Sequence, residues 1–274
     1  MTAMPDNDSQ QQQARFEIVD EHVARIVLNR PERLGAYTPT MCEELLDAIR
    51  RYRLDDNLRA LILTGTGRGF CTGGDVSPDA GFGNDLASQV GRARELREHS
   101  HAIVTALHKL DKPVVCAING IAVNGGLTFA LACDLRIAAA SARLGDTSGR
   151  AGLLPDEGGA WLLPRTMGYD KAYRMIAFSE IYDARTAFDI GLVTEVVPDT
   201  ELEVRSRAVA RQLTEKAPLA LRAVKFMMRR AMESSLESSL GDAQQAVLWV
   251  GPSADATEGK TAFLERRAPR FSGR

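Results

Sequence analysis

The sequence has no long hydrophobic run, few cysteines and histidines, and almost no net charge. None of its apolar stretches reaches the roughly 20 uncharged residues that a membrane helix needs. The first 14 residues are polar and lack the apolar core of a secretory signal. A formal net charge of −2 gives no general attraction to nucleic acid or to anionic membranes. We therefore expect a cytoplasmic protein with a disordered tail at residues 1–14 and no nucleic-acid or membrane partner.

Cysteine and histidine are too scattered to predict a metal site. The four cysteines lie in apolar or turn settings without metal-binding spacing, which is typical of reduced, mostly buried thiols. Cys71 sits inside a glycine-rich turn, but no histidine is clearly placed to activate it as a nucleophile. His99 and His101 are two residues apart on a predicted helix and face different directions. The sequence therefore predicts neither a metal site nor a cysteine nucleophile.

What the sequence does contain is two Gly-Gly pairs, each soon after an apolar strand. Residues 114–118 predict a buried strand, and the pair at 125–126 opens an apolar segment typical of a helix buried all round. Residues 60–64 predict another strand, which leads into the pair at 73–74. A lone Gly-Gly pair is explained by a tight turn with close packing. Two such turns could also bring one backbone N–H group each to a single oxygen, as in an oxyanion hole.

The order of the elements predicts parallel strands joined by crossover helices. Residues 15–19 and 23–28 alternate as a hairpin, Thr38 and Pro39 predict a helix start, and residues 89–110 have a helical period. A dinucleotide-binding fold is excluded because Phe70 stands where its fingerprint needs a third glycine. Residues 77–88 predict a mobile loop. From Tyr169 onward the chain is mostly helical, with helices expected at residues 171–178, 184–191, 202–216, 219–232 and 236–250.

Five segments occur in an order that resembles the crotonase (enoyl-CoA hydratase/isomerase) superfamily. They are residues 29–36, 69–75, 120–134, 152–159 and 258–271. The branch that the chain resembles most is that of the enoyl-CoA and ring-epoxide isomerases of phenylacetate catabolism. The resemblance implies an α/β (α+β) fold in which ββα units form a spiral with two nearly perpendicular sheets, over residues 15–200. Residues 201–274 would be helices that cover the active site and build a homotrimer, or a hexamer of two trimers.

The resemblance also implies an acyl-CoA thioester as the substrate, with coenzyme A present only as part of it and no other cofactor. The amides of Gly74 and Gly125 would stabilise the thioester enolate. Arg33 would meet the phosphates of coenzyme A and Ala36 its adenine. Phe263 and Arg266 would reach the nucleotide phosphates, often those bound by a neighbouring subunit, although a solvated helix end explains them equally well. The other residues expected around the substrate are Gly73, Asp75, Val76, Thr128 and Ser148, of which Asp75 is also expected to cap the next helix.

The identity of the acid/base group separates the members of the superfamily. Its hydratases use two glutamates, and their positions fall here on Thr128 and Ser148, neither of which is a carboxylate. Asp156 matches the aspartate of the isomerase branch and is the acid/base that the resemblance implies. Glu157 could exchange roles with it, but we expect Glu157 to point elsewhere, because adjacent residues near a helix start diverge by about 100°. Asp146 is a weaker candidate on the same turn.

Two further expectations concern Asp156 and Asp134. Leu153, Leu154 and Trp161 predict an apolar setting for Asp156, although Asp156 could also be only the N-cap of a helix that begins near residue 158. Asp134, which follows the buried helix, is expected to brace the turn there. The prediction is an acyl-CoA isomerase that shifts a double bond. The alternatives are an enoyl-CoA hydratase with displaced acids and a catalytically silent acyl-CoA-binding protein.

Overall fold

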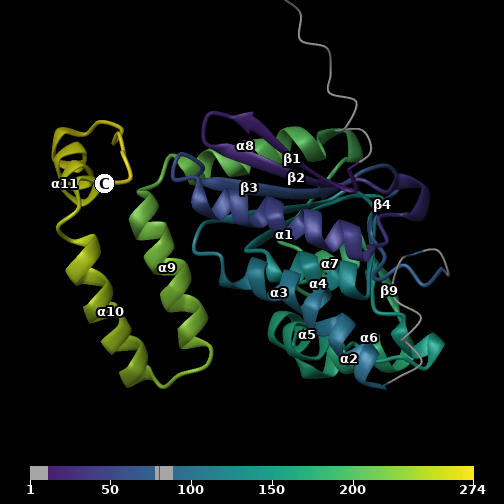
Figure 1. Ribbon diagram of the computed structural model, residues 1–274. Helices are drawn as coiled ribbons and strands as arrows, with labels where there is room; N and C mark the ends of the chain where they lie inside the picture. Colours follow the sequence, from purple (N-terminus) through teal and green to yellow (C-terminus); the bar gives the residue numbers. More distant parts are fainter. Residues whose placement is uncertain (1–11, 78–79, 81–88) are drawn as a thin grey trace, which may run out of the picture.

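The computed structural model describes residues 12–77, 80 and 89–274 of the chain (Figure 1). Most of the predicted tail lies outside the described residues, as does the loop predicted at residues 77–88 except for Ser77 and Ala80. Strand β1 begins at Ala14, one residue earlier than we predicted. No helix among the described residues is long and apolar enough to cross a membrane.

Two sheets are built from strands that alternate along the chain. The larger has the order β1 (Ala14–Asp20), β2 (Val23–Leu28), β3 (Ala60–Gly65), β5 (Val114–Ile118), β7 (Leu135–Ala139), β10 (Glu195–Val197), and the smaller has the order β4 (Gly69–Cys71), β6 (Ile121–Val123), β8 (Arg143–Gly145), β9 (Ile181–Asp183). The pairs β3/β4, β5/β6 and β7/β8 each give one strand to each sheet and then lead to a helix. This succession of ββα units confirms the predicted spiral fold. The antiparallel hairpin β1–β2 is also confirmed.

Helices cover both faces of the larger sheet. The described residues form the α-helices α1 (Pro39–Leu54), α2 (Gln89–Glu98), α3 (Ser100–Lys109), α4 (Gly125–Ala132), α5 (Gly159–Met167), α6 (Tyr169–Phe178), α7 (Ala184–Asp189), α8 (Leu202–Thr214), α9 (Pro218–Ala231), α10 (Leu236–Val250) and α11 (Ala254–Glu265), of which only some contact the sheet. Helix α8 lies on one face of the larger sheet, and α1, α3 and α4 lie toward the other (Figure 1). In β3, Ala60 and Ile62 pack toward α8, whereas Leu61 and Leu63 pack toward the α1 side. A strand buried on both faces has an unbroken apolar sequence, which is why these strands could be predicted.

Two helix predictions had different outcomes. The hydroxyl oxygen of Thr38 accepts a hydrogen bond from the N–H of Met41 (3.1 Å), which confirms Thr38 as the N-cap of α1. The single helix predicted over residues 89–110 is wrong. His99, with φ −111° and ψ −88°, leaves the helical conformation and divides the segment into α2 and α3.

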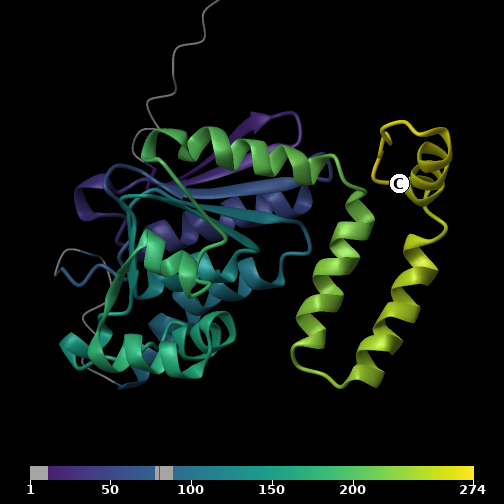
Figure 2. The ribbon, with the colours of Figure 1, turned by 180° about the vertical axis from the view of Figure 1, so that it is seen from behind.

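The last three helices leave the two-sheet body as an arm, which Figures 1 and 2 show from opposite sides. Helix α10 packs beside α9, and α11 lies on the side away from the sheets, whereas the residues after α11 turn back toward α9 and the carbonyl of Phe271 accepts a hydrogen bond from Arg59 (3.1 Å). The arm exposes many large apolar side chains to solvent in the single chain. They include Phe226, Met228, Met232, Leu236, Leu240, Val247, Leu248, Trp249, Phe263 and Leu264.

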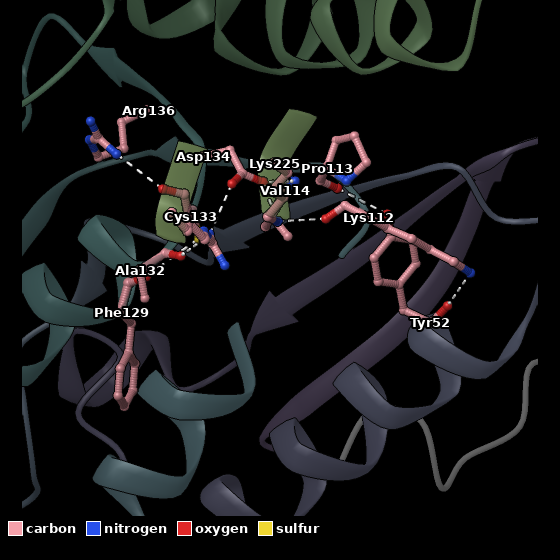
Figure 3. Close-up of polar contacts among 11 residues, drawn as sticks. Tyr52, Lys112, Pro113, Val114, Phe129, Ala132, Cys133, Asp134, Arg136 and Lys225 are labelled. Atoms are coloured by element: carbon pink, nitrogen blue, oxygen red, sulfur yellow. Dashed lines mark hydrogen bonds and ion pairs between the residues drawn. The ribbon is translucent and has the colours of Figure 1, made fainter. Parts of the chain in front are cut away.

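Asp134 joins the arm to the body (Figure 3). Its carboxylate accepts a hydrogen bond from the N–H of Val114 (2.8 Å), which confirms that it braces the turn after α4. The same carboxylate pairs with Lys225 (2.6 Å) and Arg229 (3.0 Å) of α9. Burial lowers the pKa of Lys225 despite the nearby charge of Asp134. The cluster therefore holds two poorly hydrated cations on one carboxylate.

Replacing Asp134 by asparagine should lower the free energy of unfolding by about 3 kcal/mol, because the substitution leaves two partly buried cations without a counter-charge. Urea denaturation measures the change. Asp189→Asn is the matched control, since Asp189 pairs with Arg185 (3.0 Å) on an exposed helix face and should contribute less than about 1 kcal/mol. Equal losses in the two variants would contradict the bracing role.

Candidate active site

The two Gly-Gly turns lie against each other, backbone to backbone. A methyl group built on Gly126 would lie 2.0 Å from the carbonyl oxygen of Cys71. One built on Gly73 would lie 3.5 Å from the amide nitrogen of Gly125, and Gly73 itself has a φ of +94° that other residues rarely adopt. The turn after β4 and the start of α4 therefore converge, as the sequence predicts.

Pairing with Tyr37 sets the direction of the first amide. The N–H of Tyr37 donates to the carbonyl of Gly73 (2.9 Å), and its carbonyl accepts from the N–H of Asp75 (2.9 Å). In this parallel bridge the N–H of Gly74, between them, points away from Tyr37. Gly125 is the first residue of α4, where N–H groups have no acceptor within the helix. No residue of the described chain accepts a hydrogen bond from either amide, so both donors remain for a ligand.

Asn124 holds the neighbouring turns together. Its side-chain oxygen accepts a hydrogen bond from the N–H of Thr147 (2.7 Å), and its side-chain nitrogen donates to the carbonyl of Thr72 (3.5 Å). Its own N–H donates to the carbonyl of Gly145 (3.1 Å). The residue has a φ of +53°, which costs about 1–3 kcal/mol for a residue with a side chain. Asn124 directly precedes a Gly-Gly pair but was not among the residues predicted for the site.

Arg30 fixes the turn that carries Gly74. Its guanidinium pairs with the carboxylate of Asp75 (2.9 Å) and donates to the carbonyl of Ala36 (2.5 Å). Burial raises the pKa of Asp75, but hydrogen bonds from Ser77 and Arg30 outweigh it and hold the pKa below its usual value. Asp75 therefore caps a turn at Ser77, and its expected role as the cap of the next helix concerns residues 78–88, most of which lie outside the described residues.

The residues predicted to meet coenzyme A lie at the edge of this turn. Ala36 is buried, Arg33 is exposed at the end of the short 3-10 helix Pro31–Arg33, and the Val76 side chain is 92% exposed. Phe263 (83% exposed) and Arg266 belong to the end of α11, at the far end of the arm from α4 and β4 (Figures 1 and 2). The structure therefore does not bring Phe263 and Arg266 to the two glycine turns of the same chain.

The two positions that match the glutamates of hydratases are both buried. Thr128 donates a hydrogen bond from its hydroxyl to the carbonyl of Asn124 (3.2 Å), within the first turn of α4. The hydroxyl of Ser148 donates to the carboxylate of Asp146, which also accepts from the Ser148 N–H (3.0 Å). Asp146 is itself only 3% exposed. Thr128 and Ser148 thus complete local turns, and neither provides a base.

Glu157 points into the site, contrary to our expectation. Its two carboxylate oxygens lie 2.5 and 2.7 Å from the position that a methyl group on Gly125 would occupy. The side chain is buried, with 8% exposure, and accepts a hydrogen bond from the hydroxyl of Tyr37. The ring of Tyr37 packs on Phe129 of α4, with centroids 5.3 Å apart. A carboxylate therefore lies beside Gly125, the second of the two glycines whose amides converge.

Asp156 is half-buried on the same turn. Its backbone carbonyl lies 2.7 Å from Nε2 of His101. It does not cap the next helix, because α5 has Gly158 as its N-cap with a φ of +99°, and the N-cap interpretation is therefore wrong. Leu153 and Leu154 are 50% and 70% exposed, so they do not give Asp156 the apolar setting that we expected.

Because it is buried, Cys71 is not available as a nucleophile. Its side chain has no exposure, and burial raises the pKa of the thiol to about 12. The other three cysteines are buried free thiols as well. Within the described part of the chain, no three His, Cys, Asp or Glu side chains group closely enough to hold a metal ion.

Comparison with known proteins matches most of the chain to one family. The family described as enoyl-CoA hydratase/isomerase matches residues 19–274. The chain is 36% identical to the 1,2-epoxyphenylacetyl-CoA isomerase of Escherichia coli, over 93% of this chain and 97% of that protein. It is 39% identical to a probable enoyl-CoA hydratase of Rhodobacter capsulatus, over 95% and 98%. The crystal structure of an enoyl-CoA hydratase from Bacillus anthracis matches with a TM-score of 0.90 at 32% identity, over 96% and 100%.

Gly126→Ala should destabilise the protein by about 1–3 kcal/mol, because the new methyl group would overlap a backbone oxygen that cannot move alone. Gly241→Ala is the control, since a methyl group on this glycine of α10 meets nothing within 4 Å. That variant should be neutral or up to about 1 kcal/mol more stable. Urea denaturation compares the two, and an unchanged midpoint for Gly126→Ala would contradict the close approach of the turns.

Proposed function

The chain belongs to the enoyl-CoA hydratase/isomerase family, and we propose that it is an acyl-CoA isomerase that shifts a double bond along an enoyl-CoA. The observation that carries the proposal is the pair of converging amides, Gly74 and Gly125, beside acidic side chains. When a proton leaves the acyl chain, the thioester oxygen takes on negative charge. Two preorganised N–H donors stabilise that charge, and one such donor is typically worth about 3–4 kcal/mol.

We assign the proton transfer to the acyl chain to Asp156. It occupies the position that the isomerase branch uses for its aspartate, and it lies on the turn that also carries Glu157 to the site. Because Asp156 is only half-buried, it can exchange its proton with water. The reaction needs no redox or metal chemistry, so the proposal includes no cofactor beyond the coenzyme A of the substrate.

Isomerisation is favoured over hydration by the side chains at two positions. Thr128 and Ser148 replace the two glutamates that would hold and activate water, and both are engaged in local turns. Hydration stays the second candidate for two reasons. Asp146 and Glu157 are buried carboxylates on neighbouring turns, and relatives with either activity in their names align over 93% of the chain. Hydration of crotonyl-CoA at an ordinary enzymatic rate, without double-bond migration in longer substrates, would select the hydratase.

The coenzyme A site is proposed to involve two chains. Arg33 and Ala36 lie on the segment before α1, next to the turn of Gly74. Gly73 and Asp75 hydrogen-bond to Tyr37 of that segment, and Val76 follows Asp75 with its side chain exposed. Phe263 and Arg266 lie at the end of the arm and would reach the nucleotide bound by a neighbouring subunit. Assembly as a trimer, or as a hexamer of two trimers, would also bury the apolar side chains of the arm.

Asp156→Asn should lower the rate of double-bond migration by a factor of about 10²–10⁴, the usual contribution of a positioned acid/base group. The shift of 3-enoyl-CoA to 2-enoyl-CoA is followed by absorbance over a panel of chain lengths. Asp170→Asn, at an exposed acid in α6, is the control and should keep the wild-type rate. Double-bond migration at a near wild-type rate in Asp156→Asn would contradict the assignment of Asp156 as the acid/base.

Sedimentation should give a mass of three or six chains of 29.8 kDa. Leu248→Glu places a charge on the arm, at a side chain that is 69% exposed in the single chain, and should shift the mass toward one chain. Val204→Glu, at a 71% exposed position of α8 outside the arm, should leave it unchanged. A wild-type protein that sediments as a single chain at micromolar concentration would refute the shared coenzyme A site.

A further inference from the structure

Glu157 occupies a place in the site that the proposed function does not yet use. Its carboxylate lies where a side chain on Gly125 would be, so only glycine leaves room for it there. A thioester whose oxygen bonds the amides of Gly74 and Gly125 has its α-carbon two bonds from that oxygen. Glu157, beside Gly125, would therefore lie within reach of the α-carbon of such a thioester.

Tyr37 fixes the distance between this carboxylate and the first amide. Its backbone is paired with Gly73 and Asp75, and its hydroxyl donates to Glu157. Burial, and then the negative charge of Glu157, raise the pKa of Tyr37 well above its usual value, so the hydroxyl keeps its proton and stays a donor. A donated hydrogen bond favours the charged form of the carboxylate, which is the form that a base needs. Tyr37 thus positions the turn of Gly74 through its backbone and the carboxylate of Glu157 through its hydroxyl.

We propose that Glu157 is a second catalytic carboxylate, which removes the proton from the α-carbon, and that Tyr37 is its positioning residue. The inference rests on the proposed function and divides its proton transfers between two groups. Glu157 forms an O–H bond with the α-proton, and the electron pair of the C–H bond moves toward the thioester oxygen. The amides of Gly74 and Gly125 hold the resulting dienolate.

The second half of the reaction falls to Asp156. The electron pair on the oxygen re-forms the carbonyl, the double bond moves next to it, and the γ-carbon bonds a proton that Asp156 relays from water. Glu157 then returns its proton to water, so that the protein and the number of protons end as they began. Since the two protons are different ones, the γ-carbon of the product should take its new hydrogen from solvent.

The experiment separates the two carboxylates by following the α-carbon alone. Hexanoyl-CoA and phenylacetyl-CoA carry no double bond to move, and their α-protons exchange in deuterium oxide if a base removes them. Mass spectrometry measures the uptake of deuterium by the wild-type enzyme, Glu157→Gln and Asp156→Asn. We expect at least a 100-fold loss of α-exchange in Glu157→Gln and a rate within threefold of wild type in Asp156→Asn. Both variants should lose double-bond migration.

Two further variants test the geometry without touching the carboxylate. Gly125→Ala keeps the amide but places a methyl group against Glu157, so it should reduce α-exchange. Tyr37→Phe keeps the ring and removes the hydrogen bond, which should lower the exchange rate and move the acidic limb of its pH profile to higher pH. Unchanged exchange rates and an unchanged profile in both variants would overturn the positioning role, and urea denaturation confirms that each variant folds.

The outcomes distinguish the inference from the function on which it rests. A wild-type enzyme that neither exchanges α-protons nor moves a double bond overturns the proposed function itself. Suppose that the wild-type enzyme moves the double bond. Full α-exchange in Glu157→Gln, or lost α-exchange in Asp156→Asn, then overturns only the assignment of the two proton transfers to different carboxylates. Direct transfer of the substrate hydrogen from the α-carbon to the γ-carbon, without uptake of solvent deuterium, also overturns the assignment of the two proton transfers to Glu157 and Asp156.

Discussion

The contact between two backbones, at Gly126 and Cys71, is the constraint from which the site follows. Helix α4 begins only where the turn after β4 leaves room for it, and the gap between them admits no side chain. This approach places the amides of Gly74 and Gly125 on the same small volume. Backbone donors held in this way need no rearrangement when charge develops on a ligand, and that is the physical basis of their effect.

Local patterns of the sequence predict much of the architecture. Strands β3 and β5 are apolar on both faces because they lie between two layers of helices, and the Gly-Gly pairs mark where backbones meet. The break at His99 carries no local signal, since the apolar positions keep a helical spacing through it. The strands β9 and β10 have three residues each, too few to show a period, and pairing with β8 and β7 defines them.

The direction of the Glu157 side chain could not be predicted from local sequence. The expectation assumed that Asp156 and Glu157 already follow helical geometry, in which neighbours diverge by about 100°. Helix α5 begins only at Gly159, after Gly158 takes a positive φ, so the two acids belong to a turn. The turn sends Glu157 toward Tyr37, a residue 120 positions earlier in the chain. Only the folded chain contains that contact.

Two locally unfavourable features occur together on these turns. Burial removes the carboxylate of Glu157 from water, which costs hydration free energy, and Asn124 holds a backbone conformation that costs about 1–3 kcal/mol. An apolar side chain at 157 and a glycine at 124 would relieve both. Sequences are otherwise locally consistent with their folds, so departures that cluster are expected at functional sites. Here they flank the amides of Gly74 and Gly125, which links the unfavourable local features of these turns to the proposed stabilisation of a thioester enolate.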